Sequence, residues 1–87
     1  MERSSTQLLN LIDRTCQSFR LAQEAKGNHF YTQLIDALEA NLPKLAADKA
    51  AYLNQILPPL FAAQSRRDTL FLCDILEYEI RPLFETQ

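Results

Sequence analysis

The segment at residues 70–84, LFLCDILEYEIRPLF, constrains the fold more than any other part of the chain. At about 100° per residue, its apolar side chains cover most of a helix circumference. Only Asp74, Glu77 and Arg81 form a polar strip, and that strip is narrow. A helix that is apolar on most of its surface must be covered on most of its surface. The segment therefore needs several packing neighbours, from its own chain or from another.

One side of this predicted helix is the hardest to cover within a chain of 87 residues. It consists of Phe71, Ile75, Tyr78 and Pro82. A tyrosine suits an interface because its ring can be buried while its hydroxyl stays hydrated. We therefore predict that this side contacts another chain. The alternative is that the segment is simply the central helix of a small bundle.

Glu79 interrupts the apolar pattern of the segment, because it lies between Leu72, Ile75 and Leu83 on the helical wheel. An unpaired buried carboxylate there would be destabilising. Two explanations stay open: the last turn frays near Pro82 and Glu79 reaches water, or Glu79 makes a buried polar contact. The candidate partners for that contact are Arg14, His29, Asn41, Arg66 and Arg67, or the surroundings of Glu79 in a partner subunit.

Two parts of the chain share a register. Residues 34–39 read LIDALE and residues 72–77 read LCDILE, and a proline follows each, Pro43 and Pro82. The pattern indicates two related helical hairpins packed as a pseudo-symmetric four-helix unit, with chance similarity between amphipathic helices as the alternative. In this alignment Asn41 and Glu79 are equivalent core-facing residues, and we expect them to be buried polar partners.

Three further helices are predicted, over about residues 6–26, 28–40 and from Pro43 or Asp48 to 65. Gly27 is expected to end the first as its left-handed C-terminal residue. Pro58-Pro59 kinks the third helix or breaks it into two. Asp68 is the predicted N-cap of the fourth helix. Because every connection is short, the predicted fold is all-α, one domain over residues 1–87 built as a small antiparallel four-helix bundle.

Composition and charge narrow the class of protein. The chain is 47% hydrophobic with a single glycine, which is typical of a globular helical protein. A net charge of -2 argues against nucleic-acid binding, which needs a basic face. No apolar run approaches the roughly 20 residues of a membrane span, and the first ten residues contain no secretion signal of useful length. We therefore expect a cytoplasmic protein.

The residues that usually carry chemistry are sparse. Cys16 and Cys73 lack metal-ligand spacing and fall on apolar arcs, so we expect core thiols in a reducing compartment. His29 is the only histidine and has no Cys or His at ligand spacing, which argues against zinc. Gly27 stands alone, so no phosphate-binding loop is present. The prediction is a non-enzymatic protein without a metal or cofactor.

The pair Arg67-Asp68 and the segment DILEYEIRPLF at residues 74–84 resemble a recurring segment of small uncharacterised all-helical proteins of bacteria. The resemblance covers the last quarter of the chain, and it implies no activity.

These observations favour a protein–protein interaction module that self-associates as a homodimer or binds a partner helix through its C-terminal helix. One alternative is a small export or assembly chaperone that holds an amphipathic client helix, similar in general form to the short helical chaperones of bacterial secretion and flagellar systems. Another is a ligand carrier with a bundle-core pocket lined by Glu79, Asn41, Tyr31 or Tyr78.

Overall fold

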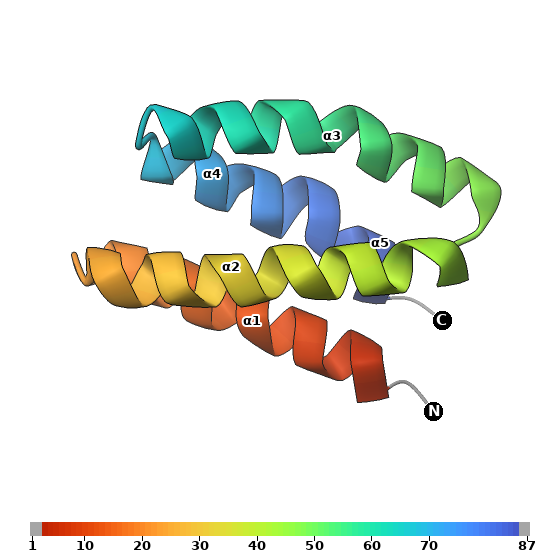
Figure 1. The fold of residues 1–87 in the computed structure, drawn as a ribbon, viewed down its shortest axis with the longest axis horizontal. Helices are drawn as coiled ribbons and strands as arrows, with labels where there is room; N and C mark the ends of the chain where they lie inside the picture. The colour runs from red at the N-terminus through yellow and green to blue at the C-terminus, as the bar shows by residue number, and fades with distance from the viewer. Residues whose placement is uncertain (1–2, 86–87) are drawn as a thin grey trace. The chain divides into compact units, whose positions relative to one another are not determined.

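The computed structural model describes residues 3–85, with side chains described from residue 6, and is built of helices joined by short turns (Figure 1). The helices are α1 (Arg3–Arg20), α2 (Glu24–Asn41), η1 (Leu42–Lys44), α3 (Ala47–Ser65), α4 (Thr69–Asp74), η2 (Ile75–Ile80) and α5 (Arg81–Glu85). No strand occurs among the described residues. The predicted all-α class is confirmed.

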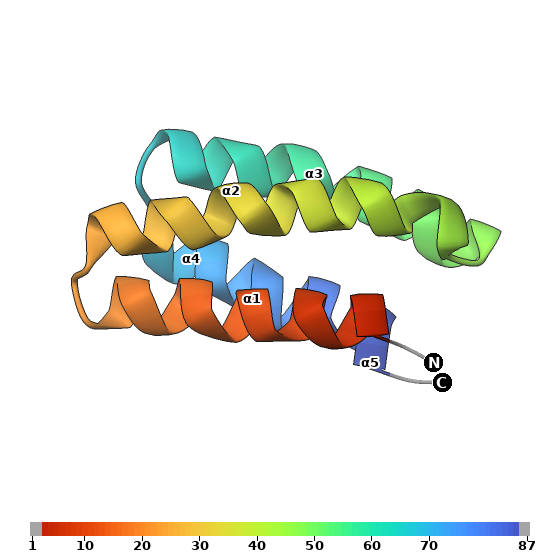
Figure 2. The ribbon, with the colours of Figure 1, turned by 60° about the horizontal axis from the view of Figure 1, so that its bottom comes forward.

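The chain divides into two compact units, Met1–Pro43 and Lys44–Gln87. The first contains α1 and α2, and Figure 2 shows α2 running back along α1. The second contains α3 followed by α4, η2 and α5, which continue one another without a break. Each unit is thus a helical hairpin.

In the first hairpin, a stripe of buried side chains follows the helical period on each helix. The stripe of α1 includes Leu8, Ile12, Thr15 and Cys16, and that of α2 includes Tyr31, Leu34 and Leu38. Apolar residues at three- and four-residue spacing are the pattern that buries one face of a helix. Cys16 is therefore a core residue, as predicted.

Gly27 has a different role from the one predicted. The helix α1 ends at Arg20, and the left-handed residue of the turn is Ala22, at φ 60°. Gly27 lies inside α2 and is buried. A Cβ atom added to it would lie 2.5 Å from Cε1 of Phe19 on α1. The missing side chain of Gly27 therefore makes room for the ring of Phe19, and the expectation that Gly27 ends the first helix is wrong.

The two hairpins use the same turn. Leu21, Ala22 and Gln23 donate their N–H groups to the carbonyls of Gln17, Phe19 and Ser18 at 3.0, 3.0 and 2.8 Å. In the second turn Arg66, Arg67 and Asp68 donate to Ala62, Gln64 and Ala63 at 3.1, 3.1 and 2.9 Å. Both turns place a non-glycine residue in the left-handed region, since φ is 60° at Ala22 and 59° at Arg67. These bonds satisfy carbonyl groups that every helix end leaves unpaired.

This shared turn corrects the alignment of the two halves. It makes Ala22 equivalent to Arg67, and continuing the correspondence along the helices pairs Tyr31 with Leu76. The alignment places Glu79 level with Leu34, and not with Asn41. The LIDALE and LCDILE segments are therefore not structurally equivalent, although the chain does consist of two hairpins.

The helix α3 runs without interruption from Ala47 to Ser65 and contains both Pro58 and Pro59. Each proline leaves unpaired the carbonyl four residues earlier, at Asn54 and Gln55. Both of these residues are exposed, so water can hydrate the free carbonyls. The predicted break into two helices does not occur for this reason.

The middle of the C-terminal helix is a π-helical turn. At its end the N–H of Arg81 donates to the carbonyl of Leu76, five residues earlier. Pro82, which follows directly, cannot donate an N–H and would crowd the carbonyl four residues before it in a regular α-helix. Because the helix widens just before Pro82, the chain continues as α5 to Glu85 instead of ending.

The π turn changes which side chains share a face. Leu72, Leu76, Ile80 and Phe84 are buried at a regular four-residue spacing, and Cys73 and Ile75 are buried beside them. In a regular α-helix each four-residue step drifts by about 40° around the axis. A wider turn takes up this drift and keeps the four residues on one side of the helix.

Candidate functional site

The exposed side of the C-terminal helix follows the same four-residue period. Leu70, Asp74, Tyr78 and Pro82 are all exposed, and we call these four residues the outer stripe. The side chain of Leu70 is 80% exposed and that of Tyr78 is 71% exposed. An isolated exposed leucine is ordinary on a protein surface, whereas apolar residues repeated along one helix face form a potential binding surface.

The outer stripe differs from the predicted interface of Phe71, Ile75, Tyr78 and Pro82. Tyr78 and Pro82 are exposed as expected, and Phe71 is 41% exposed. Ile75 is buried, with 5% of its surface exposed, so it cannot contact a partner directly. Leu70 was missed. The wheel drawn at a regular α-helical angle placed Ile75 beside Tyr78, and the π turn separates them.

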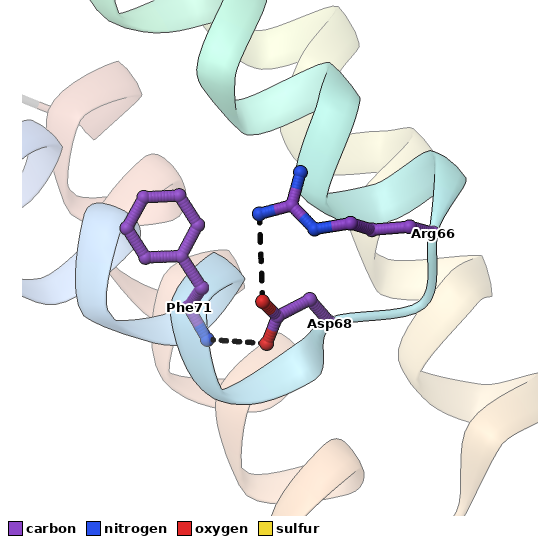
Figure 3. Close-up of polar contacts among 3 residues, drawn as sticks. All are labelled: Arg66, Asp68 and Phe71. Carbon is purple, nitrogen blue, oxygen red and sulfur yellow. Dashed lines mark hydrogen bonds and ion pairs between the residues drawn. The ribbon is translucent and has the colours of Figure 1, made fainter.

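Phe71 lies in a small polar cluster at the beginning of α4 (Figure 3). The carboxylate of Asp68 accepts the N–H of Phe71 at 3.2 Å, which is the predicted N-cap. The same carboxylate pairs with the Arg66 guanidinium at 3.4 Å, and that guanidinium lies 5.6 Å from the centre of the Phe71 ring. Arg66 therefore already occupies one face of the ring.

Glu79 has a partner that the sequence did not indicate. It is half-buried on η2 and accepts a hydrogen bond from the hydroxyl of Tyr52 on α3. This hydrogen bond raises the pKa of Tyr52, and burial and the negative charge of Glu79 act in the same direction. The helix does not fray before Pro82. The predicted partners of Glu79 within the chain were wrong, since Tyr52 is none of the five candidates. Glu79 is only half-buried, and this exposure does not require the helix to fray.

Asn41 is buried, as predicted, with 6% of its surface exposed. Its side-chain amide donates to the carbonyl of Ala37 in the same helix at 2.8 Å. Asn41 and Glu79 therefore each have a hydrogen-bond partner inside their own hairpin. Neither residue therefore depends on the other to satisfy its polar atoms.

Two surface grooves lie along the first hairpin, and none of the residues predicted to line a ligand pocket borders them. The larger has a volume of about 430 Å³ and the smaller about 290 Å³, and Arg14 borders both. Tyr31, one of the predicted lining residues, is buried instead, and its hydroxyl makes no hydrogen bond within the described part of the chain. Burial raises the pKa of Tyr31 to about 12.

Cys16 and Cys73 are buried and are not joined in a disulfide. Between residues 3 and 85, no three His, Cys, Asp or Glu side chains are grouped so that they could hold a metal ion. The described helices also include none of the length and apolar character that a membrane crossing requires. The outer stripe is therefore the feature of the described chain that we take as the candidate site.

No known family model, no characterised protein and no solved structure matches this chain.

Proposed function

We propose that this chain is a non-enzymatic protein–protein interaction module that self-associates through the outer stripe of its second hairpin. The observation that supports the proposal is the exposure of Leu70 and Tyr78, at 80% and 71%, on one face of a single helix. Association would remove these apolar surfaces from water, which is the main favourable contribution to most protein–protein binding.

The expected affinity is modest. Burying one leucine side chain completely contributes about 1.5–3 kcal/mol, and a symmetric dimer buries Leu70 twice. Association itself costs about 4 kcal/mol or more in lost translational and rotational freedom. Leu70 alone therefore barely offsets that loss, and contacts by Tyr78 and Pro82 must add the rest. We expect a dimer that dissociates in the micromolar range, as small interfaces generally do.

Sedimentation equilibrium of the full chain over a range of concentrations tests the proposal. Leu70→Glu removes two copies of the apolar contact and places a charge in the interface. We expect it to raise the dimer dissociation constant by about a hundredfold or more. Leu21→Glu is the matched control, because Leu21 is a 59% exposed leucine in the turn of the first hairpin.

A wild-type chain that stays monomeric at the highest soluble concentration would overturn the proposal. An equal loss of association in the Leu21→Glu control would do the same, since the effect would then reflect general surface charge. Circular dichroism of both variants checks that each keeps its helices.

Several finer expectations stay predictions. They are the antiparallel packing of the four helices in one domain, a bend at Pro58-Pro59, a cytoplasmic location, and the chaperone and ligand-carrier alternatives. The self-association proposal depends on none of them, because it uses only residues of the second hairpin.

A further inference from the structure

We infer that two copies of this chain pair through their outer stripes in an antiparallel, two-fold symmetric arrangement, in which Asp74 of each copy faces Tyr78 of the other and Arg67 of each faces Glu85 of the other. The inference rests on the proposed self-association and specifies its geometry. The second copy of the chain is the single occupant that it assigns to this surface.

The spacing of the outer stripe is what makes it suitable for symmetric pairing. Its four residues, Leu70, Asp74, Tyr78 and Pro82, follow one another at equal four-residue steps. In a two-fold interface, if one residue contacts a second, the second also contacts the first. When the stripe is turned end for end about the level of Leu76, Leu70 faces Pro82 of the second copy and Asp74 faces Tyr78.

The groups that this arrangement brings together are chemically complementary. A carboxylate accepts hydrogen bonds and a tyrosine hydroxyl can donate one. Within residues 6–85, neither the Asp74 carboxylate nor the Tyr78 hydroxyl has a hydrogen bond or an ion pair, and both residues are exposed. Symmetry makes the contact twice, and hydrogen bonds to a charged acceptor are stronger than neutral ones.

Neighbouring arrangements are less favourable. Sliding the antiparallel pair by one step in one direction places Asp74 directly against Asp74 of the second copy, where the two carboxylates repel. Sliding it the other way stacks Tyr78 on its own copy and leaves Leu70 without an apolar neighbour. A parallel symmetric pair also places Asp74 against Asp74. The arrangement centred at Leu76 avoids all three defects.

Charged residues at the two ends of the outer stripe favour the same two-fold axis at the level of Leu76. Arg67 precedes α4 and Glu85 ends α5, and both are exposed. Each lies nine positions from Leu76, so Arg67 of one copy reaches the level of Glu85 of the other. Glu85 also pairs with Arg81 of its own helix at 3.9 Å, which holds its carboxylate near the end of the stripe. Opposite charges at both ends favour the antiparallel direction and this register.

Charge reversal tests the geometry, with dimer dissociation constants measured by sedimentation equilibrium at low ionic strength. Arg67→Glu alone and Glu85→Arg alone each replace two attractive pairs by two repulsive ones. We expect each to raise the dissociation constant by about tenfold. Combining both substitutions in one chain, R67E/E85R, restores the opposite charges and should return the constant to within about threefold of wild type.

Mixing the two single variants provides a second readout of the same charges. A heterodimer of the Arg67→Glu and Glu85→Arg chains has opposite charges at both ends, so it should form more tightly than either homodimer. A parallel pair instead places Arg67 against Arg67 and Glu85 against Glu85 already in wild type, so neither single variant would weaken the homodimer. The dissociation constants of the single-variant homodimers therefore separate the two directions. A double-mutant cycle tests the hydrogen bond between Asp74 and Tyr78. Tyr78→Phe should weaken association in the wild-type background and have little effect in an Asp74→Ala background.

The outcomes separate the two proposals. If wild type dimerises and Leu70→Glu disrupts the dimer, but the single charge reversals do not weaken the homodimer, or mixing them does not restore pairing, the antiparallel register is wrong while self-association stands. A monomeric wild type removes both. Weakened homodimers of both single variants, together with restored pairing in the mixture and in the double variant, support the geometry proposed here.

Discussion

Gly27→Ala should destabilise the chain, although the same change inside most helices stabilises it. Gly27 lies in α2 and is buried, and an added Cβ would lie 2.5, 2.7 and 2.9 Å from three ring atoms of Phe19. Separations this short require the ring to move. Phe19 is half-buried, so its ring can shift outward only by giving up contacts on the first hairpin.

Two opposing effects set the size of the change. Replacing glycine by alanine inside a helix contributes about 1 kcal/mol of stability through helix propensity. Forcing an extra methyl group into a packed site costs about 1–3 kcal/mol. We therefore expect the free energy of unfolding to fall by about 0–2 kcal/mol. In a Phe19→Ala background the clash is absent, and Gly27→Ala should raise stability by about 1 kcal/mol.

Urea denaturation followed by circular dichroism measures the four free energies of this double-mutant cycle. The expected coupling between Gly27 and Phe19 is about 1–3 kcal/mol. Asn28→Ala is a control for propensity alone, since Asn28 is exposed and directly follows Gly27 in the same helix. If Gly27→Ala stabilises wild type and the Phe19→Ala chain equally, the close approach of the ring does not explain the glycine.

Two further predictions concern the second hairpin. Asp68→Ala should lower the free energy of unfolding by about 1 kcal/mol through loss of the N-cap bond to Phe71, whereas Asp68→Asn, which keeps an acceptor, should lose less; urea denaturation measures both. Glu79→Gln should lower the pKa of Tyr52 and leave the pKa of Tyr31 at about 12, and tyrosinate absorbance measures both. An unchanged Tyr52 titration would contradict the assigned hydrogen bond. Because the pKa of Tyr52 is raised in the folded chain, the stability that this bond provides is present below about pH 10 and is lost as the pH rises through the raised pKa.

The turns show how far local sequence signals reach. Asp68 was correctly identified as an N-cap, because a short acceptor side chain before an apolar run is a local signal. The first turn gave no such signal. Its left-handed residue is Ala22, and the hydrogen bonds of the turn, not the intrinsic preference of alanine, hold it at φ 60°. The glycine five residues later attracted the prediction instead.

The pair of Tyr52 and Glu79 was missed for a related reason. The two residues lie far apart in the chain, and they face each other only once the turn between α3 and α4 has been placed. The predicted partners of Glu79 were cationic side chains and one amide, and a tyrosine hydroxyl was not among them. Once the turn is known, Tyr52 becomes a candidate partner, because it lies on the opposite helix at a similar distance from the turn.

By itself, the sequence determined that this chain is helical and where its second turn begins, because capping and apolar periodicity act over a few neighbouring residues. Only the tertiary structure decided the π turn before Pro82, and with it the exchange of Ile75 for Leu70 on the exposed side. A π turn has a less favourable backbone hydrogen-bond geometry than a regular α-helix, and no local sequence preference compensates for that loss. It forms where burying every fourth residue against a neighbouring helix outweighs that cost, and this balance exists only in the folded chain.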